Sequence, residues 1–197
     1  MLPKSSEIVA FHDKCLVRAD WPAREARHAN GVWAWIEANH RFNSQLWAEE
    51  DLARRRDVAD HEIAKNKRAI DGFNQARNDA MERIDEEVLV ALASVSPAHD
   101  ARQHSETAGM MVDRLSIMAL KILAMREQTM RADVDDAHRN NCAQKLERLV
   151  EQRQDLAACL DGLVAACVAG HAYYKIYRQF KMYNDPTLNP QLYKPRT

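Results

Sequence analysis

Residues 105–122 read SETAGMMVDRLSIMALKI, and this stretch decides the fold class. Its apolar residues recur every three or four positions, which predicts an amphipathic helix over about 106–131 with Ser105 as its N-cap. Glu106, Asp113 and Arg114 interrupt the apolar pattern. Gly109 lies between the two acids, and its missing side chain allows another backbone, a ligand or an ion to approach closely. The stretch therefore predicts a buried helix that carries charges.

The rest of the chain extends this helical pattern. Among 197 residues there are only 5 Gly and 6 Pro, and no run of alternating β-branched residues predicts a strand. The length suits one domain over 1–197. We expect an all-α fold, an antiparallel bundle of four long helices with a short N-terminal helix.

Turn residues give approximate bounds for the remaining helices. Ser6 begins the short first helix, and Pro22 suits the first turn of a second helix over about 22–56, which Gly31 can kink. A third helix is expected over about 61–94, followed by a loop. A fifth pattern runs from near Asp133 to about 183, with possible bends at its glycines. The tail, 184–197, contains three prolines and is expected to be extended and non-helical.

Composition excludes several classes of protein. The formal charge is -1, from 28 basic and 29 acidic residues, which argues against duplex nucleic acid as a partner. The four cysteines have no zinc or redox spacing. No apolar stretch is long enough for a membrane span or a signal peptide, so we expect a cytoplasmic protein. The eight histidines form no i, i+4 metal pair, and most are expected at the surface.

The third helix carries polar residues on and beside its apolar seam. Positions 63, 66, 70, 73, 77, 80/81, 84 and 88 follow the spacing of a buried seam, and Asn66 and Arg77 lie on it. An adjoining strip contains Lys67, Asp71, Asn74, Asn78, Glu82 and Asp85. The spacing alone favours a solvated helix face with one snorkelling arginine as the explanation of this pattern.

The second helix has a similar seam, in which Glu50 and Arg54 accompany large apolar residues and two amides. Unpaired burial of such groups costs several kcal/mol each, so they need partners. We expect Glu50 or Asp51 to pair with Arg77 or Arg114 across facing helices. We also expect the charges of the fourth helix, Glu106, Asp113 and Arg114, to face Glu50, Arg54, Asn74 and Arg77.

These residues support two kinds of chemistry. Arginines present planar forks to phosphate or carboxylate, and Asn74 and Asn78 can hold sugar hydroxyls, which together predict an anion-binding strip between helices. Alternatively, Glu82 and Asp85 form an E-x-x-D pair of the kind used by all-helical nucleotide pyrophosphohydrolases, and could bind Mg²⁺. Near the C-terminus, Lys181 belongs to a run of interleaved aromatic and basic residues that can stack on a base and hold a phosphate.

Four segments resemble a bacterial family known only as a domain of unknown function, all-helical and about 200 residues long. They are LWAEEDLAR at 46–54, KRAIDGFNQARNDAMERIDE at 67–86, SETAGMMVDRLSIMALKI at 105–122 and YRQFKMYNDPTLNPQLY at 177–193. Members of that family are often encoded near lipopolysaccharide and surface-glycan genes, beside glycosyltransferases. The resemblance marks Trp47 and Lys181 as signature residues and implies a role in glycan assembly.

The residues and the resemblance together predict a protein that binds a phosphorylated or sugar-nucleotide ligand. The alternatives are a Mg²⁺-dependent nucleotide or sugar-phosphate hydrolase or transferase, and a helical adaptor that docks on a glycosyltransferase. The predicted ligand-binding residues are Trp47, Glu50, Asp51, Arg54, Lys67, Asp71, Asn74, Arg77, Asn78, Glu106, Asp113, Arg114 and Lys181.

Overall fold

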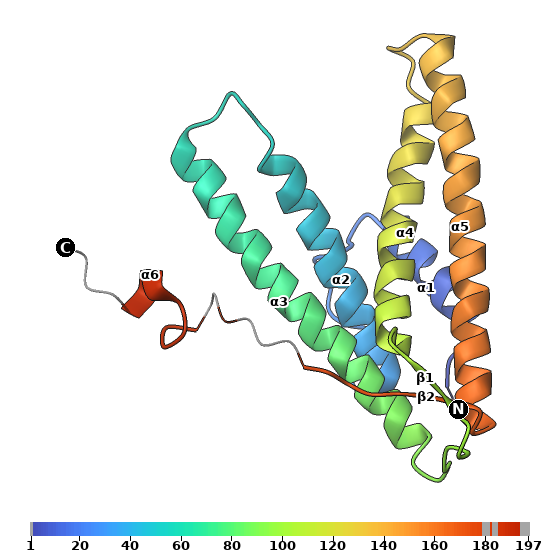
Figure 1. Ribbon diagram of the computed structural model, residues 1–197. Coiled ribbons are helices and arrows are strands. Elements are labelled where there is room, and N and C mark those ends of the chain that lie inside the picture. Colours follow the sequence, from blue (N-terminus) through green and yellow to red (C-terminus); the bar gives the residue numbers. More distant parts are fainter. Residues whose placement is uncertain (1, 179–181, 183–184, 194–197) are drawn as a thin grey trace.

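A computed structural model describes residues 2–178, 182 and 185–193 of the chain and confirms the all-α class (Figure 1). Four long helices form two antiparallel hairpins, and short connections at 53–59 and 130–135 keep each pair adjacent. The first hairpin contains α2 (Gly31–Leu52) and α3 (Asp60–Ala91), and the second contains α4 (Ala108–Thr129) and α5 (Asp136–Val168).

The two hairpins meet at one end and diverge toward their tips (Figure 1). Helix α4 is central, because it contacts α2 and α3 as well as its own partner α5. The short helix α1 (Ser5–Leu16) packs against α4 and α5. Within the described part of the chain, no helix is long and apolar enough to cross a membrane.

The hydrophobic core lies where α1 and the two hairpins come together. Ile8 of α1, Ile36 of α2, Ile84 of α3 and Leu115 of α4 are almost fully buried, and Leu160 of α5 completes this layer. The apolar seams predicted for the third and fourth helices both face this core. Burial of one such side chain contributes about 1.5–3 kcal/mol.

The second helix begins later than its sequence pattern predicts. Residues 17–30 form an irregular loop, the Trp21–Pro22 bond is cis, and α2 starts at Gly31. Gly31 has φ +69°, a left-handed conformation that favours glycine. The prediction of a helix from residue 22 was therefore wrong, because Pro22 belongs to a turn and Gly31 marks the helix start.

The fifth helix ends earlier than predicted. Gly170 adopts φ +72°, and the N–H groups of Gly170 and His171 donate to the carbonyls of Cys167 and Ala166. These bonds form a Schellman motif, which satisfies the terminal carbonyls and stops the helix at Val168. Gly170 is thus a terminator, although the sequence pattern continues past it.

The segment after Gly170 forms a short strand instead of helix. Strand β2 (Ala172–Tyr174) pairs in parallel with β1 (Arg102–His104), with Gln103 opposite Tyr173. Each strand has only three residues, too few to show the period-2 alternation that identifies strands. The expectation of no strands was therefore wrong in this one place.

Two end regions also differ from the sequence prediction. Helix α4 is capped by Thr107 instead of Ser105, since Thr107 Oγ1 accepts a bond from the Met110 N–H. The tail contains a four-residue helix, α6 (Pro190–Tyr193), where a non-helical segment was expected. Pro190 occupies the first helical position, which proline tolerates, and the Asn189 side chain accepts from the Gln191 N–H.

Candidate functional site

A cluster of polar side chains is buried where α2 meets α4. Asn39 and Asn43 of α2 each donate from Nδ2 to Asp113 Oδ1 over 2.9 Å, and Asn43 Nδ2 lies 3.0 Å from Ser116 Oγ. All four residues are buried. Buried polar groups cost free energy unless they are hydrogen-bonded. These four side chains are therefore compatible with the core because they satisfy one another.

The cluster continues through stacked rings toward α1. His40 Nδ1 lies 2.8 Å from Ser116 Oγ, and the His40 ring stacks on His12 and Trp21 with centroid distances of 4.4 and 5.2 Å. Burial lowers the pKa of His40 to about 3. Burial and the neighbouring His40 hold the pKa of His12 well below its ordinary value. Both rings are therefore neutral near pH 7.

Next to this cluster, a pocket of about 280 Å³ opens between α2, α3 and α4. We call it the α2–α4 pocket. Five of the predicted ligand-binding residues line it together with apolar residues of α4 and with Asn43 of the polar cluster. The predicted residues are Trp47, Glu50, Asp51, Arg54 and Arg77.

Arg77 connects the buried cluster to this pocket. Its Nε lies 3.8 Å from Asp113 Oδ1, close enough for an ion pair but not for a hydrogen bond. Its Nη2 donates to Asn78 Oδ1 over 3.3 Å. The Nε is buried and, among the described residues, has no hydrogen-bond acceptor. Arg77 thus has an unused donor close to the pocket.

The ion pairs differ from those expected across facing helices. Arg54 pairs with Glu50 over 2.7 Å at i, i+4, and Arg77 pairs with Asp113. Asn66, also on the α3 seam, donates to Glu49 of α2 over 2.6 Å. The expected pairing of Glu50 or Asp51 with Arg77 or Arg114 was wrong, because helical spacing does not show which residues on two helices come face to face. The expectation that Asp113 faces Arg77 is confirmed.

Several predicted site residues lie elsewhere. Arg114 pairs with Glu106, and both line a separate groove of about 970 Å³ between α4 and α5. Lys67 and Asp71 are exposed on α3, away from the α2–α4 pocket. Lys181 lies outside the described residues. Asp113 and Asn78 are buried, Asn74 is half-buried, and none of the three lines the α2–α4 pocket.

The predicted metal pair, Glu82 and Asp85, meets the start of α4. Asp85 Oδ2 accepts from Thr107 Oγ1 over 2.6 Å, and Asp85 Oδ1 accepts from the Gly109 N–H over 2.7 Å. Burial raises the pKa of Asp85 to about 6, against the lowering effect of these bonds. Among the described residues, no three or more His, Cys, Asp or Glu side chains are placed to hold a metal ion.

Gly109 has the close neighbour that its missing side chain predicted, and that neighbour is a backbone. A Cβ at Gly109 would overlap the Met81 carbonyl oxygen of α3 and would lie 2.8 Å from Asp85 Oδ2. Helix α3 therefore occupies the space in which a ligand or an ion was considered.

Sequence reasoning missed His12, His40 and Ser116 as members of the polar cluster. His12 follows the buried Phe11 and lies one turn after Ile8, and His40 follows Asn39 on the α2 seam. Ser116 is three residues after Asp113, on the same side of α4. Their positions on the apolar faces of their helices could have indicated that they are buried. The expectation that most histidines lie at the surface led to the wrong prediction.

The matched family segment covers most of this region. Residues 33–176 match the family model described as "Protein of unknown function (DUF4254)". The chain belongs to this family. The matched residues include the α2–α4 pocket and most of the polar cluster, and begin after α1 and the 17–30 loop. No curated protein and no solved structure matches the chain.

Proposed function

We propose that this DUF4254 protein binds a small phosphorylated sugar in the α2–α4 pocket. The observation that carries the proposal is the presence of Arg77 in the lining of a pocket that also contains Trp47 and two carboxylates. The Arg77 guanidinium meets Asp113 only at 3.8 Å and donates to Asn78 over 3.3 Å, which leaves donor capacity for a ligand oxygen.

The mixed charge of the pocket suits a ligand with both phosphate and hydroxyl groups. Arg77 and Arg54 can donate to phosphate oxygens, while Glu50 and Asp51 can accept from sugar hydroxyls. Trp47 provides an apolar surface for a sugar ring. A pocket of about 280 Å³ is at the lower end of small-molecule sites, which favours one sugar unit over a complete nucleotide sugar. The surface-glycan context comes from the family resemblance alone.

The sequence also suggested a Mg²⁺-dependent hydrolase. Both oxygens of Asp85 accept hydrogen bonds at the α3–α4 contact, so the Glu82/Asp85 pair is less suited to a metal than a solvent-facing pair. The binding experiment below also tests the adaptor hypothesis. An adaptor that has no small-molecule ligand would show no saturable binding.

Thermal unfolding and calorimetric titration with hexose phosphates, with and without Mg²⁺, test the proposal. A ligand at 100 times its Kd stabilises the folded state by about 2.7 kcal/mol, which raises Tm by roughly 5–11 °C for a chain of this size. Asp51→Asn is the most informative variant, because Asp51 is exposed and its replacement should leave the fold unchanged.

Asp51→Asn and Arg77→Lys should weaken binding, whereas Lys67→Ala should not. Lys67 is a matched control: it belongs to the same predicted set but lies outside the pocket. Equal weakening by Lys67→Ala, or no hexose phosphate bound by the wild type, would rule out this pocket as the site.

A further inference from the structure

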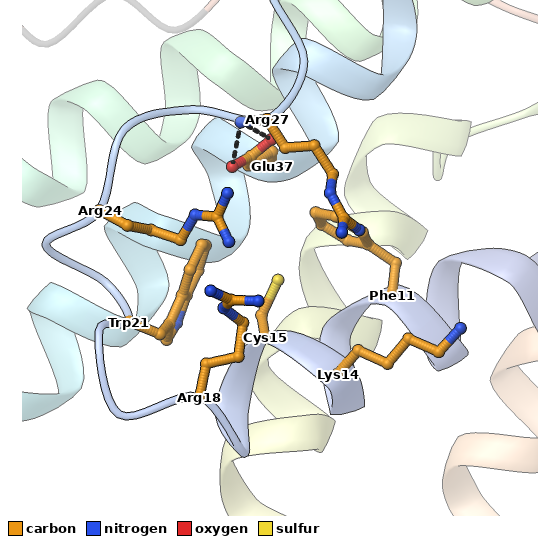
Figure 2. Close-up of a pocket in the computed structure, with 8 residues that line it drawn as sticks. All are labelled: Phe11, Lys14, Cys15, Arg18, Trp21, Arg24, Arg27 and Glu37. Atoms are coloured by element: carbon orange, nitrogen blue, oxygen red, sulfur yellow. Dashed lines mark hydrogen bonds between the residues drawn. The ribbon is translucent and has the colours of Figure 1, made fainter.

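A second pocket lies between α1 and the loop 17–30, on residues that the sequence did not single out. It has a volume of about 240 Å³ and is lined by four cations, Cys15, Glu37 and the rings of Phe11 and Trp21 (Figure 2). We call it the loop pocket. The cations are Lys14, Arg18, Arg24 and Arg27.

The arginines of the loop pocket converge. Figure 2 shows the Arg18 and Arg24 guanidinium groups on the same side of the pocket, close to Trp21 and Cys15, with Arg27 over Phe11, while the Lys14 chain extends away. Like charges this close repel one another, and an anion between them removes the repulsion. Arg18 is balanced by Asp20 through two bonds of 2.9 and 3.0 Å.

The other two arginines have no acidic partner. Within the described chain, neither the Arg24 nor the Arg27 guanidinium makes an ion pair, and the side-chain bond of Arg24 goes to the Glu25 carbonyl. Their charges are therefore available to a ligand.

Glu37 does not neutralise these arginines, because its carboxylate has other partners. It accepts from the backbone N–H groups of Arg27 and His28 over 2.9 and 3.1 Å, and it pairs with Arg41 at 3.4 Å. Its side chain is only 2% exposed. Arg41 in turn donates to the carbonyls of Pro22 and Arg24. Glu37 and Arg41 thus fix the loop in shape, so the loop pocket is preorganised.

Cys15 adds no negative charge. Burial, with a contribution from Glu37, raises the pKa of the Cys15 thiol to about 11, so the group is a neutral thiol near pH 7. It neither competes with an anion nor acts as a thiolate nucleophile. The chemistry of the loop pocket is therefore that of binding.

We propose that the loop pocket is a second ligand site, which binds the phosphate group of a small soluble phosphate or diphosphate. Arg24 and Arg27 make charge-assisted bonds to the phosphate oxygens, and Phe11 and Trp21 provide walls for an attached organic group. This site is independent of the α2–α4 pocket, with which it shares no lining residue. Its four cations precede residue 33, where the family match begins.

Calorimetric titration of the full chain with pyrophosphate and with inorganic phosphate tests this site. The wild type should bind pyrophosphate saturably, and Arg27→Gln and Arg24→Gln should each weaken binding by about tenfold or more. Arg27 is exposed, so Arg27→Gln should keep the melting temperature of the wild type. Arg68→Gln is the matched control, because it removes the same charge from an exposed position on α3 that lines neither pocket.

Three outcomes would overturn the proposal. These are no binding of either anion to the wild type, equal weakening by Arg68→Gln, and binding only to phosphatidylcholine vesicles that contain phosphatidic acid, which would make the ligand a membrane lipid. Asp51→Asn should leave pyrophosphate binding unchanged, which separates this site from the α2–α4 pocket. Pyrophosphate binding that depends on Arg24 and Arg27 would stand even if no hexose phosphate bound at the α2–α4 pocket.

Discussion

Helix α3 passes so close to Gly109 of α4 that the fold has no room for a side chain there. In Gly109→Ala, the new Cβ would overlap the Met81 carbonyl oxygen and lie 2.8 Å from Asp85 Oδ2. The two helices would have to separate by roughly 1 Å to restore van der Waals contact. Because Met81 contributes a backbone atom, a change of rotamer cannot relieve the overlap.

The separation would also break a hydrogen bond. The Gly109 N–H donates to Asp85 Oδ1 over 2.7 Å, and a bond to a charged group contributes about 1.5–3 kcal/mol. Overpacking adds about 1–3 kcal/mol, and the better helix propensity of alanine offsets about 1 kcal/mol. Gly109→Ala should therefore lower the free energy of unfolding by about 2–5 kcal/mol.

Urea unfolding followed by far-UV circular dichroism measures this change. Gly162→Ala is the matched control, because Gly162 lies inside α5, before its last turn, and a Cβ there has no atom within 4 Å. That control should gain up to about 1 kcal/mol. If Gly109→Ala unfolds at the same urea concentration as Gly162→Ala, the close contact between α3 and α4 is wrong.

Two further predictions concern pH. The pKa of Asp85 is raised to about 6 in the folded state, so between about pH 4 and 6 the folded protein keeps a proton that the unfolded chain has lost. As pH rises through this window, Asp85 therefore lowers the free energy of unfolding by about 3 kcal/mol. In urea titrations, the free energy of unfolding of Asp85→Asn relative to wild type should therefore increase by about 3 kcal/mol from pH 4 to 7. If this difference between the two proteins is the same at both pH values, Asp85 is not a buried charge. The lowered pKa of His12 gives a pH dependence of stability in the opposite direction. As pH falls below about 6.5, the unfolded chain binds the proton before the folded protein does, so acidification lowers the free energy of unfolding. His12→Phe should therefore reduce the loss of stability on acidification from pH 7 to 5 in urea titrations, and an unchanged pH dependence would contradict the burial of a neutral His12 ring.

The sequence predicts the helices well where their apolar spacing is continuous. The α3 seam faces the neighbouring helices as its spacing indicates: Ile84 and Val88 enter the core, Asn66 contacts α2 and Arg77 contacts Asp113 of α4. Gly109 is recognisable as a point of close approach because no other residue provides that space. These features depend on local geometry, which the sequence contains directly.

Helix ends and helix partners are less predictable for separate physical reasons. The left-handed conformations at Gly31 and Gly170 determine where α2 begins and α5 ends, but a glycine in a helical pattern can equally bend the helix or leave it straight, as Gly162 does. Partner choice depends on the angle between helices. Two arginines and two carboxylates can pair in several ways, and the structure selects Arg77 with Asp113.

Asp113 and Asp51 differ in what their substitution would test at the α2–α4 pocket. Its Oδ1 accepts from Asn39 and Asn43, and the same oxygen faces Arg77 at a distance too long for a hydrogen bond. Asp113 therefore holds Arg77 in place electrostatically while leaving the Arg77 Nε donor unused. Loss of the Asp113 carboxylate would disturb the fold and the pocket together, because two buried amides would lose their acceptor. Asp51, which is exposed at the pocket, has no such structural role, so its variants report on binding alone.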